Sequence, residues 1–184
     1  MSEHQIAHEK IQSLLETKEL AALGPEPRAS REPLKSLEAK LDRTFSETNV
    51  LPSAQPLISS LVLLWHDYLD ESHSISQGIH SADGSFLHGI MHRREPDYAN
   101  AKYWFHRVGN HPSFPFIAEK ASKILNETRF HNLKSKLICE NAWNAFAFVD
   151  ACEVALREND KATISILQRI QEIEFKTLLE HFLR

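Results

Sequence analysis

Seven of the eleven histidines in the chain lie between Trp65 and Pro112, together with several carboxylates and arginines. An imidazole moves protons near neutral pH, a carboxylate orients it, and a guanidinium holds an anion. Imidazoles are also common metal ligands. We therefore expect any functional site of this chain to use side chains of this segment, and the helices around it must position them.

The first group of polar residues depends on one long helix from Pro56 to about Gly78, which a strongly apolar run at residues 57–65 predicts. On such a helix His66, Asp70 and His73 share one face, because steps of four and three residues average close to the helical period. The sequence thus predicts one polar stripe, which follows the apolar run on the same helix.

A second polar stripe follows on the helix predicted from Phe86 to Glu95. His88, His92 and Glu95 stand at i, i+4 and i+7. Two histidines four residues apart can present two ligands to one metal ion, and a carboxylate one turn later can orient them. The match is one of spacing, because no glutamate follows His88 as in the helical zinc-protease signature.

Fixed positive charge adjoins the second stripe at Arg93 and Arg94, which would suit a carboxylate or phosphate group. The leading interpretation is a polar pocket for a small polar or anionic ligand. Its predicted ligand-binding residues are His66, His73, Arg93, Arg94, Tyr98 and Trp104. In a catalytic version His92 or His88 is the general acid or base, and Asp70 or Glu95 orients it.

Two other interpretations use the same histidines. In one of them the cofactor is a divalent metal ion, bound by His66, His73, His88 and His92. In the other the imidazoles form a hydrogen-bonded network that ties helices together and has no chemical role.

Another charged group lies in the apolar stretch 142–156, which predicts a helix through the interior. If Asp150 and Glu153 are buried there, they need cations such as Arg93 or Arg94. If their stripe is the solvent face, Glu153 pairs with Arg157 along the helix. Both interpretations stay open at this point.

The rest of the chain predicts an all-α, single-domain multi-helix bundle, since no stretch alternates apolar and polar residues and there are only five glycines. Residues 50–184 form the predicted domain of six to eight helices. Residues 1–49 form a helical N-terminal extension with a Pro-rich linker around Gly24. Further helices are expected at residues 2–22, 34–45, 97–108, 116–127 and 160–182.

Composition excludes two classes of partner. The net charge of −4 and the lack of a long basic run argue against nucleic-acid binding, and no run of about 18 apolar residues predicts a membrane span. Two cysteines, Cys139 and Cys152, in apolar surroundings favour reduced thiols in the cytosol. The sequence makes no prediction of oligomeric state.

Residues 88–112, HGIMHRREPDYANAKYWFHRVGNHP, and residues 148–155, FVDACEVA, carry a resemblance to known proteins. They resemble a family of uncharacterised helical proteins with an HGIxHRREPDYxNAKYWFxRxGxHP-type signature and a later FVDxCExA segment. The resemblance covers about the last two-thirds of the chain. It implies a fold of related helices and carries no activity with it.

The part from His88 to Phe105 also resembles one helical hairpin of the tetratricopeptide or Sel1-like repeats. Such arrays need about three repeats for stability and the chain holds no second copy, so a solenoid is not expected. This resemblance implies a protein-interaction module with an exposed aromatic groove, formed by Tyr98, Tyr103, Trp104 and Phe105.

Overall fold

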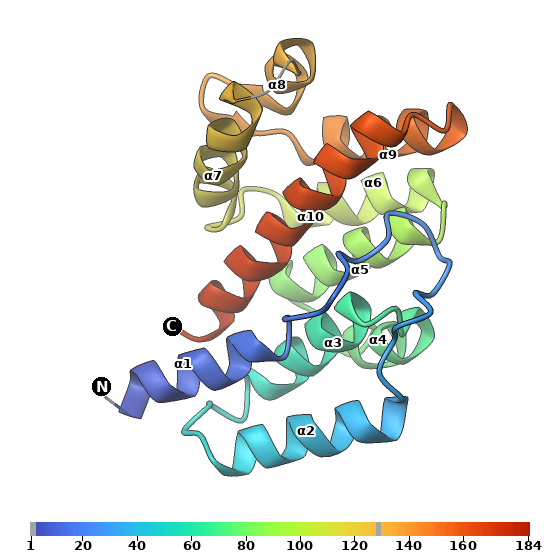
Figure 1. The fold of residues 1–184 in the computed structure, drawn as a ribbon. Coiled ribbons are helices and arrows are strands. Elements are labelled where there is room, and N and C mark those ends of the chain that lie inside the picture. The colour runs from blue at the N-terminus through green and yellow to red at the C-terminus, as the bar shows by residue number, and fades with distance from the viewer. Residues whose placement is uncertain (1–2, 128–129) are drawn as a thin grey trace.

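The computed structural model describes residues 3–127 and 130–184, and this part of the chain forms ten α-helices and one two-stranded hairpin (Figure 1). The predicted all-α, single-domain bundle is confirmed. The elements in chain order are α1 (Glu3–Ser13), α2 (Leu34–Ser46), α3 (Gln55–Trp65), α4 (Leu69–Ser76), α5 (Ala82–Arg94), α6 (Tyr98–Val108), α7 (Phe114–Asn126), α8 (His131–Leu137), β1 (Ile138–Cys139), β2 (Ala142–Trp143), α9 (Ala145–Arg157) and α10 (Lys161–Phe182).

The longest helix, α10, crosses the bundle diagonally and packs against α1, α3, α7 and α9 (Figure 1). Its apolar face is wide because buried side chains recur at three and four residues, as at Leu167, Ile170 and Leu178. Within the described residues no helix combines the length and the apolar character that crossing a bilayer requires.

The long helix predicted from Pro56 to Gly78 is wrong. The chain leaves α3 at His66, and Asp67 adopts a left-handed backbone conformation with a φ of 67°. Helix α4 then packs back on α3, where the Ser60 and Ser72 hydroxyl groups each donate to the other residue's carbonyl oxygen at 3.1 and 2.9 Å. His66 therefore does not share a helix face with Asp70 and His73.

The N-terminal extension belongs to the same core as the rest of the bundle. Helix α1 ends at Ser13 instead of near residue 22, and residues 14–33 continue without a helix to the start of α2 (Figure 1). Leu14, Leu15 and Leu23 are buried in the core. The predicted linker itself, residues 24–33, is mostly exposed, as expected, although Arg28 within it pairs with Asp67.

Helices α5 and α6 form a close hairpin that carries most of the predicted site. Gly89 lies against the Phe105 ring, where a Cβ atom would meet ring carbons at 2.9–3.0 Å. Helix α5 begins at Ala82, four residues before the predicted start, because Ser81 caps it by accepting a hydrogen bond from the Gly84 N–H. The hairpin fixes the two helices at short range and so fixes their histidines and aromatic rings.

Helix α9 is not buried on all sides. Phe146 and Val154 are about two-fifths exposed, at 41% and 39%. Asp150 lies on the exposed side and forms an ion pair with Lys102 of α6. Of the two interpretations of this helix, the structure supports the solvent-facing one, since Asp150 pairs with a surface lysine instead of Arg93 or Arg94. The expected pair of Glu153 and Arg157 is not formed, because Arg157 pairs with Glu158 at 3.7 Å.

Candidate functional site

Three histidine rings from two helices meet beside the α5–α6 hairpin. The His73 ring on α4 lies 5.0 Å from the His88 ring and 5.6 Å from the His92 ring, measured between centroids. The two rings on α5 are 6.1 Å apart. We call His73, His88 and His92 the imidazole cluster. It joins one member of the first predicted stripe to both histidines of the second.

His88 is held from two sides. Its Nδ1 atom donates to the Gly84 carbonyl oxygen at 3.2 Å, which leaves Nε2 with a free lone pair. The ring stacks on Trp104 of α6 with 4.1 Å between centroids and 22° between planes. Burial lowers the pKa of His88, and the nearby imidazoles add to this effect. His88 is therefore a neutral, fixed imidazole at pH 7.

His92 is paired with a carboxylate one turn later. Its Nδ1 atom lies 3.2 Å from Oε2 of Glu95, which fixes the hydrogen on Nδ1. The side-chain amide nitrogen of Asn100 lies 3.2 Å from Nε2 and 3.3 Å from Nδ1, so it does not lie along the lone pair of Nε2. Burial lowers the pKa of His92, although Glu95 opposes this effect. His92 is thus a neutral imidazole oriented by an acid.

The imidazole cluster is partly buried. His88 and His92 are 2% and 8% exposed, whereas His73 and Trp104 are partly open to solvent. Tyr98, also predicted to bind the ligand, lies instead near Cys152 and Glu153 of α9, and its partial burial raises the pKa of the phenol. The imidazole cluster is thus within reach of a small molecule, mainly from the His73 side.

Arg93 and Arg94 do not line a pocket. Both are 0% exposed, although both were predicted to bind a ligand. Arg93 pairs with Glu174 of α10 at 2.6 Å and lies over the Phe148 ring at 4.4 Å. Arg94 faces the other way, toward the α3–α4 break. Charged side chains in the core must be paired, so both guanidinium groups are occupied by the fold itself.

The partner of Arg94 is Asp67, at 2.6 Å. The same carboxylate accepts from Nε of Arg28 at 2.7 Å, so one buried acid holds two arginines. Burial raises the pKa of Asp67, but the hydrogen bonds from Arg28 and Arg94 outweigh it and leave the pKa below 3.8. Arg28 also donates to the carbonyl oxygen of Trp65 and to Thr17. This network pins residues 14–33 to the α3–α4 break.

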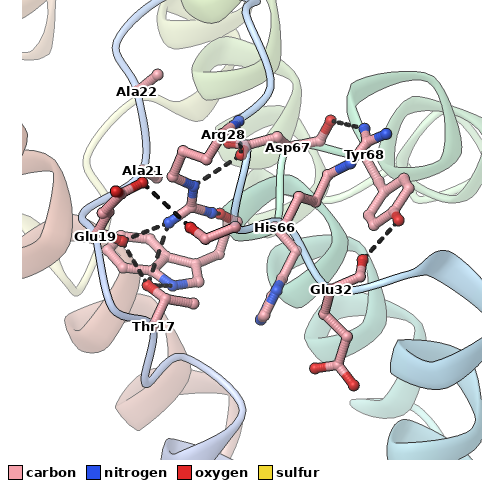
Figure 2. A network of polar contacts seen from close by, with 12 residues as sticks. Thr17, Glu19, Ala21, Ala22, Arg28, Glu32, His66, Asp67 and Tyr68 are labelled. Carbon is pink, nitrogen blue, oxygen red and sulfur yellow. Dashed lines mark hydrogen bonds and ion pairs between the residues drawn. The ribbon is translucent and has the colours of Figure 1, made fainter.

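His66 belongs to that network and not to the imidazole cluster. Its Nε2 atom lies 2.8 Å from the carbonyl oxygen of Leu14, and its ring faces Arg28 and Glu32 (Figure 2). Burial lowers the pKa of His66. A hollow opens beside it, but Arg28 already directs its donors at protein oxygens. The break at Asp67 is the physical reason that His66 is separated from His73.

The structure does not assemble the predicted alternative metal site. His66, His73, His88 and His92 all lie in the described part of the chain, and no three of their ring nitrogens gather within 4.8 Å of one another. Asp70, predicted to orient a histidine, is exposed in the first turn of α4. Asp70 and Glu95 are the two acids predicted to orient a histidine, and of these Glu95 lies within hydrogen-bond distance of His92.

The aromatic groove expected of a tetratricopeptide-like module is not formed as a unit. Phe105 is 2% exposed and packs against Phe86, with 5.4 Å between ring centroids. Trp104 is covered on one face by His88. Tyr103 is 54% exposed, with Arg107 near its ring. The rings of α6 therefore divide between the core, the imidazole cluster and solvent.

Sequence reasoning missed the residues that decide these arrangements. Asn100 carries no signal in the sequence, because it lies on α6 and meets His92 of α5 through the packing of the hairpin. Asp67 and Glu174 carried no local signal, because their partners lie far away in the chain. The sequence offers one hint: Arg93 and Arg94 end a helix with many apolar residues, and arginines buried there need acidic partners.

Comparison with known proteins adds nothing to this geometry, because no family model, no curated protein and no solved structure matches the chain. Any function must therefore be argued from the side chains and their surroundings.

Proposed function

We propose that the protein binds a small polar ligand at the imidazole cluster, with His92 as the proton acceptor. The observation that carries the proposal is the His92 ring, whose Nδ1 atom is paired with the Glu95 carboxylate and which faces His73. A carboxylate on Nδ1 and a free lone pair on Nε2 is the arrangement that orients a general base.

The chemistry of the cluster favours a ligand that donates hydrogen bonds. The Nε2 atoms of His88 and His92 are acceptors, because the Nδ1 atom of each ring is the donor to Gly84 or Glu95. Arg93 and Arg94 are buried in ion pairs, so the two arginines expected to hold an anion do not reach the cluster. A hydroxyl or amino group fits these acceptors better than a carboxylate or phosphate does.

Binding would add a hydrogen bond at His92. The ligand donor takes the lone pair of Nε2, and the side-chain amide nitrogen of Asn100, 3.2 Å from Nε2, is close enough to contact the same ligand. A neutral imidazole so placed can accept the proton of a hydroxyl group, and Glu95 stabilises the resulting imidazolium. The catalytic version of the proposal is this proton transfer, with His88 as the second acceptor.

We further propose that this binding takes place in the cytosol, where the unpaired thiols of Cys139 and Cys152 would stay reduced.

The test is a binding survey with three classes of small probe: polyols, primary amines and carboxylates. Saturation-transfer NMR is recorded on the wild type, on His73→Ala and on His92→Leu, with His106→Ala as the matched control because His106 is exposed on α6. We expect polyol or amine probes to bind the wild type and the control, and to bind both cluster variants at least about tenfold more weakly, which is about 1.4 kcal/mol.

Two outcomes would overturn the proposal. One is that no polyol or amine probe binds the wild type. The other is that His73→Ala and His92→Leu bind the probes as the control does. Far-ultraviolet circular dichroism of each variant shows that the helices are intact, so a loss of binding is assigned to the site.

A further inference from the structure

A second group of polar side chains lies where three distant parts of the chain meet. Asp83 is in the first turn of α5, His111 is in the loop between α6 and α7, and His181 is in the last turn of α10. The Nε2 atoms of His111 and His181 lie 2.9 and 3.1 Å from Oδ1 of Asp83. Neither polar stripe that the sequence predicts contains any of these residues.

The three donor atoms are close enough to share one ion. All lie within 4.8 Å of one another, and elsewhere in residues 3–127 and 130–184 no other group of three His, Cys, Asp or Glu donors does so. Two imidazole nitrogens and one carboxylate oxygen form the donor set of open transition-metal sites, in which solvent fills the remaining positions.

The surroundings give this group one closed side and one open side. The His111 side chain is 1% exposed and packs edge-on against Phe86, with 5.0 Å between ring centroids. The side chains of Asp83 and His181 are 26% and 25% exposed. An ion can therefore enter from solvent past Asp83 and His181, while His111 forms the rigid inner wall.

Charge also favours a cation here. Asp83 supplies a carboxylate oxygen between the two imidazoles. His181 stands in the last turn of α10, where the carbonyl end of the helix dipole stabilises positive charge.

We propose that Asp83, His111 and His181 bind one divalent transition-metal ion, with Zn²⁺ as the representative ion and water completing its coordination. The site does not depend on the function proposed for the imidazole cluster, since it shares no residue with it.

The hydrogen bonds of His111 set how tightly the ion is held. Nδ1 of His111 accepts the backbone N–H of Ser113 at 3.1 Å, so Nε2 carries the ring hydrogen when it donates to Asp83. An ion at Nε2 moves that hydrogen to Nδ1 and breaks the bond from Ser113. Metal-bound histidines normally donate from the second nitrogen, and loss of such a partner weakens binding roughly 10- to 100-fold. We therefore expect a site of moderate affinity.

The test is a titration of the untagged, full-length protein with ZnCl₂ by calorimetry, repeated with Co²⁺ by visible absorption. The variants are His181→Gln and Asp83→Asn, which change partly exposed side chains and leave the buried His111 in place. The matched controls are His73→Ala, in the imidazole cluster, and His106→Ala, on the surface. We expect one Zn²⁺ per chain in the wild type and in both controls, and at least about tenfold weaker binding in both variants.

Three results would overturn the site: no stoichiometric Zn²⁺ in the wild type, unchanged affinity in His181→Gln, or a loss of Zn²⁺ in His73→Ala while His181→Gln retains it. The last result would place the ion at the imidazole cluster. Probe binding by the His73→Ala and His92→Leu variants is measured separately, so failure of this site and failure of the proposed function are told apart.

Discussion

Asp67 and Arg94 form an ion pair of 2.6 Å in which both side chains are fully buried. Asp67 stands at the break between α3 and α4, and Arg94 is the last residue of α5. The pair therefore couples the left-handed backbone at Asp67 to the end of the helix that carries His88 and His92. With Arg28, it also holds the N-terminal segment on the bundle.

Removal of one partner of this pair should be strongly destabilising. We expect Arg94→Met to lower the free energy of unfolding by roughly 3–5 kcal/mol, because Asp67 keeps a buried charge with one arginine fewer. Urea denaturation followed by circular dichroism measures the change. The matched control is Lys102→Met, which breaks the more exposed pair with Asp150 and should change stability by about 1 kcal/mol or less. Equal losses in the two variants would contradict the role given to Arg94.

The pair of Arg93 and Glu174 should show strong energetic coupling. Each single substitution, Arg93→Met or Glu174→Leu, leaves one unpaired charge in the core and should destabilise by roughly 3–5 kcal/mol. In the double variant no charge remains, so we expect it to be less destabilised than the sum of the two single variants by at least about 2 kcal/mol. A double-mutant cycle by urea denaturation measures this coupling, and additive losses would refute it.

The close contact of α5 and α6 should not tolerate a methyl group at Gly89. A Cβ atom there meets the Phe105 ring at 2.9–3.0 Å, so we expect Gly89→Ala to lower stability by about 1–3 kcal/mol. Gly78→Ala is the matched control, because its Cβ atom would meet one backbone oxygen at an ordinary 3.5 Å. That variant should be neutral or stabilised by up to about 1 kcal/mol. Thermal unfolding of both proteins decides whether the helices are this close.

Acid should destabilise the fold through its buried histidines. Burial holds the pKa values of His66, His88 and His92 below 6.5, so the unfolded chain binds more protons than the folded chain when the pH falls below 6.5. Their contribution to stability is complete above about pH 6.5 and is lost as the pH decreases from there. Urea denaturation between about pH 7.5 and 5.5 measures it.

A variant at one of these histidines tests the assignment. His88→Gln should make the pH dependence shallower than in the wild type, because one of the titrating groups is removed. His106→Gln, on the exposed face of α6, should leave the dependence unchanged. If His88→Gln has the wild-type slope, protonation of His88 is not linked to unfolding.

The local spacing of apolar residues predicted most helices well, but it did not predict the break between α3 and α4. The all-α bundle, and α6 and α7 to within a few residues, follow from apolar spacing, from prolines and from capping residues such as Asp97. The break at residues 66–68 could not be predicted in the same way. The apolar run and the polar stripe fit one continuous helix, and the arginines that bond to the Asp67 carboxylate at the left-handed turn come from distant parts of the chain.

The same distinction runs through the candidate sites. Glu95 and His92 were predicted to act together because they are one turn apart on the same helix, and they do lie within hydrogen-bond distance. Asp83, His111 and His181 had no shared pattern, since each comes from a different element.

The sequence by itself determined that the chain folds into helices and which residues within one helix are neighbours, because helix formation depends on interactions between residues three and four apart. The tertiary structure alone decided which charges are buried together and which histidines meet. Those contacts depend on how the whole chain covers its apolar surface, and a buried Arg93 or Arg94 finds its acid only after distant helices have packed.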